Sequence, residues 1–191
     1  MATHGRCRLK ENVLPSQPFK SDIEKIRERA RAKMMDGAVT DAYKADKTSV
    51  LEVLNEVLAT ELVCVLRYKS HYYASKGFNK ESIGQEFLQH AAEEQVHADM
   101  VCERITQLGG EPNLNPAGLA TRSHSEYKGG STMAELIKED LVAERIAVET
   151  YSEVIRWLGN DDPTTRRMME VLLAKEEEHA NDMLDLIEKV S

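Results

Sequence analysis

Residues that interrupt helices or build sheets are scarce in this sequence. Its 191 residues include only 10 glycines and 5 prolines, and aromatic side chains make up 5%. With charged residues at 30%, this composition argues against a turn-rich β-sandwich and favours long amphipathic helices. No apolar run approaches the roughly 18 residues of a membrane-spanning helix, and residues 1–18 lack the apolar stretch of a signal peptide. We therefore expect no membrane partner.

Cysteines are also few, and their spacing argues against two kinds of site. There are three cysteines, and no two of them form a C-x-x-C motif. Neither a disulfide framework nor a zinc ribbon is therefore expected. A reducing cytoplasm suits this cysteine content best.

Helical periodicity predicts an N-terminal arm followed by four long helices. A capping-box pattern at Ser21-x-x-Glu24 predicts a short helix that ends at Asp36-Gly37. A connection of some twenty residues, 111–131, joins the second long pattern to the third. The four long patterns cover residues 48–75, 80–108, 132–158 and 161–189.

Two helical hairpins joined by one crossover describe an all-α fold, an antiparallel four-helix bundle. The predicted domains are residues 1–47, an N-terminal arm with a short helix, and residues 48–191, the bundle.

The informative residues are the charged ones that interrupt the apolar stripes of the long helices. Each helix places one glutamate among core-facing residues such as Leu58 and Tyr151, and two helices add a histidine. The six residues are Glu61, Glu94, His97, Glu144, Glu176 and His179. Each buried, ionised carboxylate would cost several kcal/mol to desolvate. Two divalent metal ions would balance the four charges, and the two imidazoles would complete the ligand shells.

The spacing of these residues supports one shared metal site. Glu-x-x-His places both side chains on one helical face, and it occurs twice, ending at His97 and at His179. Each copy begins after a glutamate of the preceding helix, 33 residues after Glu61 and 32 after Glu144. The halves thus form an approximate repeat, as expected of a di-metal site with pseudo-twofold symmetry. A single Glu-x-x-His usually marks a solvated helix face, whereas two such copies favour the metal site over chance.

The six residues and their spacing resemble the di-iron site of the ferritin-like superfamily, most closely that of bacterioferritin. Local strings agree, among them HADMVCERI from His97 and GGEPNLNP from Gly109. The resemblance covers about residues 48–190. It implies a ferroxidase in which O2 or H2O2 oxidises two Fe(II) ions, so that Fe(III) is stored as mineral in a cage and oxidative damage is limited. By the same resemblance, Glu61 and Glu144 would be terminal ligands, Glu94 and Glu176 would bridge the metals, and each histidine would bind one metal.

Two departures from bacterioferritin set the expected cofactors and assembly. Bacterioferritin has a haem-ligating methionine directly after the glutamate of its first Glu-x-x-His, where this sequence has Gln95, so no haem is expected. Only twelve residues follow His179, too few for the fifth helix that builds the 24-subunit shell. A bacterioferritin-like site without that helix is similar to Dps-like proteins, which implies a homo-oligomeric cage of 12 subunits. The carboxylate and imidazole ligands suit two iron ions, and they also admit manganese.

Four residues beside the proposed ligands each have two interpretations. Asp140 and Glu93 could accept the ring N–H of a ligating histidine or lie at the helix surface. Tyr68 is interpreted as a packed core residue rather than a redox-active or hydrogen-bonding one. His90 is interpreted as an exposed histidine rather than a guide for entering iron.

Some Dps-like proteins carry a cysteine pair near the site, and Cys64 and Cys102 are the candidates here. In an antiparallel helix pair, these residues are displaced in opposite directions from the level of Glu61. The resulting separation of about 14 Å exceeds the reach of a disulfide. We expect both to be small buried thiols.

Charge separates the arm from the bundle. Residues 1–47 carry 11 Lys/Arg and 7 Asp/Glu, a net +4, and the remaining residues carry 14 and 26, a net −12. A negative bundle would attract Fe(II) to the pores of a cage. His4, Arg6, Arg8 and Lys10 could bind DNA phosphates, as the tails of some Dps proteins do. Because the stretch is short, a cationic arm without this function is the preferred interpretation.

Alternative functions stay open at this point. One is a bacterioferritin-type iron store of 24 subunits, and another is a manganese catalase-like enzyme of the same fold. A rubrerythrin-like peroxidase is disfavoured because the sequence has no paired C-x-x-C module. A further alternative is a nucleoid-binding shell protein in which the metal site only stabilises the bundle.

Overall fold

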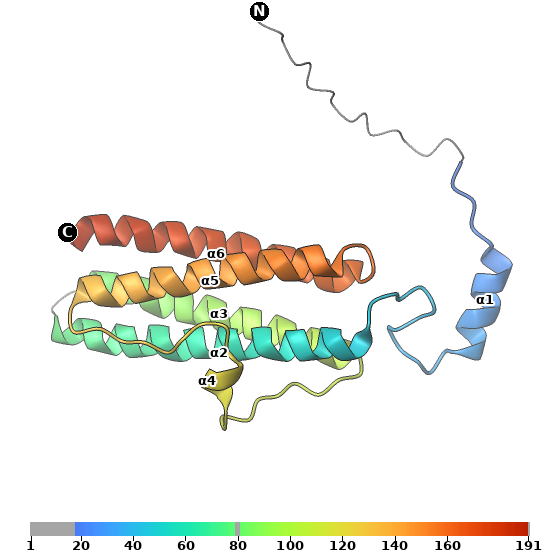
Figure 1. Ribbon diagram of the computed structural model, residues 1–191, viewed down its shortest axis with the longest axis horizontal. Coiled ribbons are helices and arrows are strands. Elements are labelled where there is room, and N and C mark those ends of the chain that lie inside the picture. Colours follow the sequence, from blue (N-terminus) through green and yellow to red (C-terminus); the bar gives the residue numbers. More distant parts are fainter. Residues whose placement is uncertain (1–17, 79–80, 191) are drawn as a thin grey trace, which may run out of the picture. The chain divides into compact units, whose positions relative to one another are not determined.

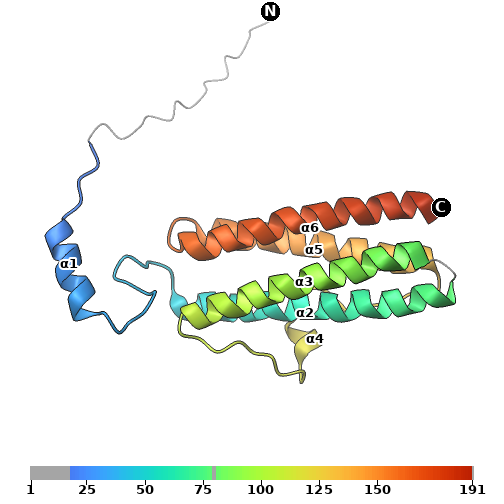
Figure 2. The ribbon, with the colours of Figure 1, turned by 180° about the vertical axis from the view of Figure 1, so that it is seen from behind.

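The computed structural model describes residues 18–78 and 81–190, and the described residues from Gly37 onward contain the predicted all-α bundle (Figures 1 and 2). Helices α2 and α3 form one antiparallel hairpin, α5 and α6 form the second, and the two hairpins pack against each other. The helices are α1 (Ile23–Ala32), α2 (Lys47–Gly77), α3 (Glu81–Gln107), α4 (Leu119–Arg122), α5 (Met133–Leu158) and α6 (Pro163–Val190). No described helix is both long enough and apolar enough to cross a membrane.

Among the described residues, those up to Asp36 and those from Gly37 onward form separate compact units. In the first unit, Asp22 caps α1 by accepting the Lys25 N–H over 3.2 Å. The predicted cap, Ser21, is therefore wrong by one residue. The division between the units precedes the predicted domain boundary at residue 47, because residues 37–46 lie with the bundle. There the Lys44 N–H donates to the Asp161 carbonyl over 3.3 Å.

Polar side chains and a glycine set the ends of the long helices close to where the sequence predicts them. Asp46 caps α2 by accepting the Ser49 N–H, and Thr132 caps α5 by accepting the Glu135 N–H, each over 3.2 Å. Gly109 follows the end of α3 with a φ of 75°, a conformation that favours glycine. The crossover between the hairpins contains the short helix α4, which the periodicity did not predict.

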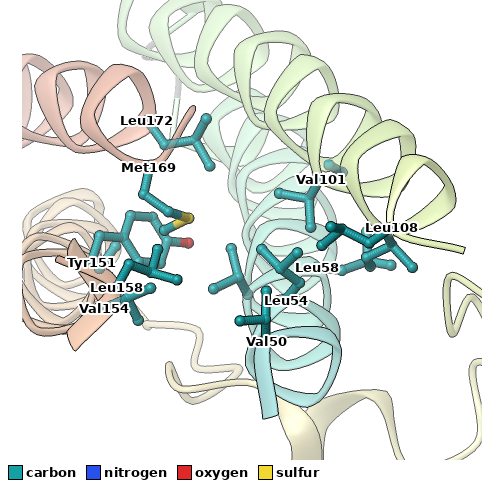
Figure 3. Close-up of a cluster of buried hydrophobic side chains, with 14 residues drawn as sticks. Val50, Leu54, Leu58, Val101, Leu108, Tyr151, Val154, Leu158, Met169 and Leu172 are labelled. Atoms are coloured by element: carbon teal, nitrogen blue, oxygen red, sulfur yellow. The ribbon is translucent and has the colours of Figure 1, made fainter. Parts of the chain in front are cut away.

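The apolar core has two parts, one toward each end of the bundle. One cluster, shown in Figure 3, includes Leu58 of α2 and Leu158 of α5. The other includes Tyr68 of α2 and Phe87 of α3. On each long helix the proposed ligands fall between the residues of the two clusters, as Glu61 falls between Leu58 and Tyr68. The fold thus gathers the ligands into one polar layer with apolar side chains on both sides.

Candidate metal centre

The six residues predicted to bind metal come together in this middle layer. All six are buried, and no more than 5% of any of them is exposed. Their ligand atoms form two clusters, and within each cluster these atoms lie within 4.8 Å of one another. The first cluster contains Glu61, Glu94, His97 and Glu176. The second contains Glu94, Glu144, Glu176 and His179.

Two carboxylates, Glu94 and Glu176, belong to both clusters, where a ligand shared by two ions would have to lie. The histidines lie close to them. His97 Nδ1 is 3.0 Å from Glu176 Oε1 and 3.2 Å from Glu94 Oε2. His179 Nδ1 is 3.1 Å from Glu94 Oε1 and 3.9 Å from Glu144 Oε2. One nitrogen of each imidazole therefore faces the carboxylates of its own cluster.

The donor atoms fit a pair of divalent ions. Among the described residues, Glu144 Oε2 and Glu176 Oε1 are buried without a hydrogen bond of good geometry, although His97 lies near the latter. Buried carboxylate oxygens without donors are costly, and a bound cation would satisfy them. Oxygen and imidazole donors without a thiolate suit iron or manganese. The ligand assignment itself stays a prediction.

Burial and neighbouring charges shift the pKa values of the carboxyl groups. Burial, with the negative charges of the other glutamates, raises the pKa of Glu61 and of Glu144 well above the usual range. Burial acts in the same direction on Glu94, but hydrogen bonds from His179 and His97 outweigh it and lower its pKa. The same layer therefore raises the pKa of two carboxyl groups and lowers that of a third.

The pKa values of the two imidazoles are also shifted, in the direction opposite to the effect of burial. Burial favours the neutral ring, but hydrogen bonds to Glu176 and Glu94 outweigh it and raise the pKa of His179 to about 11. Close contacts with the carboxylates of Glu176, Glu61 and Glu94 raise the pKa of His97 in the same way. Without a metal ion both rings are protonated at neutral pH, so a metal ion must displace these protons.

Two buried tyrosines link the terminal carboxylates across the bundle. The Tyr68 hydroxyl donates to Glu144 Oε1, and the Tyr151 hydroxyl donates to Glu61 Oε1. Each tyrosine lies seven residues after the glutamate of its own helix and binds the glutamate of the other helix. In the sequence, Tyr151 stands out only as part of an apolar stripe. The repeated spacing from Glu61 to Tyr68 and from Glu144 to Tyr151 was the signal that could have revealed the pair.

Three further polar residues can now be placed. Glu93 Oε2 lies 2.7 Å from His179 Nε2, the predicted contact with a proposed ligand. Asp140 does not contact a proposed ligand, since its oxygens lie 2.9 Å from Arg67 Nε and 2.8 Å from His71 Nδ1. The interpretation of His90 as exposed is wrong. It is fully buried, its ring stacks on His179 with centroids 4.1 Å apart, and its Nδ1 lies 3.2 Å from the Tyr68 hydroxyl.

The remaining predictions concern residues outside this layer. Cys64 is buried and Cys102 is half-buried. Both are free thiols, so they do not form a disulfide with each other, as their predicted separation indicates. Gln95 is exposed and donates to Asp99 over 3.0 Å, and the absence of haem stays a prediction. The predicted DNA contacts fall outside the described residues. They are His4, Arg6, Arg8 and Lys10.

Comparison with known proteins gives relatives of the same kind. The profile of the ferritin-like domain matches residues 51–191. A bacterioferritin of Brucella melitensis is 30% identical over 147 residues, which cover 74% of this chain and 86% of the relative. A nutrient stress-induced DNA-binding protein of Synechococcus is 29% identical over 138 residues, which cover 70% of this chain and 77% of the relative.

A solved structure is similar over most of its length. It is a dodecameric thioferritin, described as the bacterioferritin-related protein from Bacteroides fragilis. It is 25% identical in sequence and superimposes with a TM-score of 0.72, covering 87% of this chain and 94% of the other.

Proposed function

Because this chain belongs to the ferritin-like family, we propose that it is a ferroxidase and iron-storage protein that oxidises Fe(II) at the six-residue centre. One observation carries the proposal: two clusters of buried ligand atoms share Glu94 and Glu176. Shared carboxylates would hold two ions as a pair, and paired Fe(II) ions can supply both electrons to one oxidant.

Fe(II) is the substrate of the proposed reaction. Two Fe(II) ions give up one electron each, which reduces O2 with two protons to H2O2, or H2O2 with two protons to two waters. Either oxidant satisfies this balance. With H2O2 as the oxidant, the reaction would consume Fe(II) and H2O2 together, the two reagents whose uncontrolled reaction causes oxidative damage.

Residues beside the proposed ligands would orient the ligand atoms toward the ions. Tyr68 occupies Oε1 of Glu144 with its hydroxyl and leaves Oε2, which has no hydrogen bond, for an ion. Tyr151 occupies Oε1 of Glu61 in the same way. The contact of Glu93 with Nε2 of His179 would orient the ring, so that its Nδ1 faces the second cluster.

The chain is also proposed to assemble into a homo-oligomeric cage of 12 subunits. The similar structure from Bacteroides fragilis is a dodecamer. The net charge of −12 on residues 48–191, from 14 Lys/Arg and 26 Asp/Glu, would raise the local concentration of Fe(II). Fe(III) would then collect inside the cage. We place the protein in the cytoplasm, where reducing conditions keep Cys64 and Cys102 as thiols.

DNA binding is a second candidate function. It is favoured by the similarity to the Synechococcus protein, whose name describes it as DNA-binding. The cationic residues of the arm would supply the contacts. Retained binding to plasmid and unchanged protection of cells after loss of the metal centre would support this function over iron oxidation.

The test of the proposed ferroxidase is the double substitution Glu61→Ala and Glu144→Ala. We expect it to abolish rapid Fe(II) oxidation, followed by absorbance with O2 and with H2O2 in separate experiments. Subunit number, measured by light scattering, should not change, because the two residues are buried within one chain. A matched control is Glu52→Ala with Glu149→Ala, which removes two exposed glutamates from the same two helices. Oxidation at the native rate by the first variant would refute the proposed site.

A further inference from the structure

The two halves of the metal centre are alike at the ligands. Glu144 lies 83 residues after Glu61, and Tyr151 lies 83 residues after Tyr68. The Glu-x-x-His motifs repeat with an offset of 82 residues. If the symmetry extended outward, the residues packed behind the two terminal glutamates would also correspond.

Behind the ligands the correspondence breaks down. Beside Glu144 stand three buried polar residues, Arg67, His71 and Asp140, none more than 2% exposed. Counted forward by 83 residues, Arg67 corresponds to Thr150 and His71 to Val154. Counted back by 83 residues, Asp140 corresponds to Val57. Both valines belong to an apolar core cluster. A buried cation and its partners therefore support only one of the two halves.

Arg67 joins three parts of the chain at this point. Its Nε donates to Asp140 Oδ1 of α5 over 2.9 Å. One terminal nitrogen donates to the Glu126 carbonyl of the crossover over 3.2 Å, and the other donates to Cys64 Sγ over 3.4 Å. His71 completes the group by contacting the second oxygen of Asp140 at 2.8 Å. The guanidinium thus fastens α5 and the crossover to α2.

This group acts on the same two helices as the proposed ligands. Asp140 lies four residues before Glu144, one turn away on the same face of α5. Tyr68 follows Arg67 on α2 and donates to Glu144. Any shift of α5 along α2 would therefore move Glu144 away from the second cluster and from its tyrosine.

We propose that Arg67 is a positioning residue for one metal position: through Asp140 it holds Glu144 in place for the ion bound with His179. The position of Glu61 and His97, backed by Val57 and Val154, does not depend on it. This inference rests on the proposed metal centre. The two metal positions would then differ in the residues that keep their glutamate ligands in place.

The test uses Co2+ as the probe and its visible absorption as the readout, with affinity measured by titration of the full chain. Glu61→Gln should disable the metal position of Glu61 and His97 and leave that of Glu144 and His179 intact. Glu144→Gln should do the reverse. Arg67→Met is then added to each background. We expect about 10-fold weaker Co2+ binding in the Glu61→Gln background, at the low end of the range for residues behind metal ligands. No change is expected in the Glu144→Gln background.

Arg104→Met is the matched control. Arg104 is also buried, pairs with Asp162 over 3.0 Å and donates to Thr165 over 2.8 Å. It lies two turns beyond His97 on α3, about 10 Å along the axis. We expect this control to lower the unfolding temperature without changing Co2+ affinity in either background. Arg67→Lys should give intermediate affinity, because it keeps the charge and loses the forked contacts.

The outcomes separate the two proposals. Failure of the unsubstituted chain to bind two Co2+ ions would refute the metal centre itself. If it binds two, equal weakening in both backgrounds, or none in either, would overturn the role of Arg67. If Arg67→Met does not fold, Asp140→Asn keeps the shape of its side chain and makes the same comparison.

Discussion

Loading the metal centre with divalent ions should release protons, because four of its six ligand groups have raised pKa values. Burial and the other carboxylates raise those of Glu61 and Glu144. Hydrogen bonds to carboxylates outweigh burial in the two histidines and raise their pKa values, to about 11 in His179. Each of these four groups thus holds its proton more tightly in the metal-free centre than it would in water.

The two imidazoles set the size of the effect. Both rings are protonated at neutral pH in the metal-free centre, so two ions would displace at least about two protons, or about one per ion. Each proton contributes about 1.4 kcal/mol per pH unit, so affinity should rise at least about 10-fold per ion for each unit of increasing pH. The sign follows because higher pH removes the competing proton. This dependence should persist until the pH approaches the raised pKa of His179, about 11.

The assay is a pH-stat titration of metal-free protein with Fe(II) under anaerobic conditions. A parallel measurement gives affinity between about pH 6 and 8. Glu144→Gln provides an internal check, because its amide carries no displaceable proton and total release should fall. Release of fewer than about one proton for two bound ions, or an affinity independent of pH, would refute the assigned protonation states.

Two further predictions concern the metal-free fold. Tyr151→Phe removes the hydrogen bond to the buried carboxyl of Glu61 and should lower the free energy of unfolding by about 1–3 kcal/mol; denaturation that matches the unsubstituted chain would show that this bond contributes nothing. Leu54→Ala removes a fully buried side chain from the cluster of Figure 3 and should cost about 2–5 kcal/mol in the same assay, whereas a cost under about 1 kcal/mol would contradict its place in the core.

The helices and the site layer were predictable because both leave periodic signals in the sequence. Glu61 and Glu144 interrupt apolar stripes at positions where no uncompensated charge is stable, and the two Glu-x-x-His motifs repeat at a matching distance. The apolar runs and the glycines set the four long helices to within a few residues.

The features that escaped prediction depend on contacts between distant segments. The burial of His90 follows from its stacking on His179 of another helix, which its own helix does not reveal. Arginine is seldom buried, and the partners that accompany the burial of Arg67, Asp140 and the crossover, lie far from it in the sequence. Helix α4 is too short to leave a periodic pattern, and Asp22 competes with Ser21 for one cap.

The binding of an iron pair in the middle layer of the bundle can be observed by diffraction at the iron absorption edge, from crystals loaded anaerobically with Fe(II). We predict two anomalous peaks per chain, one in each cluster, with Glu94 and Glu176 contacting both. No peak in this layer, or one peak in place of two, would show that the layer does not bind a pair of iron ions.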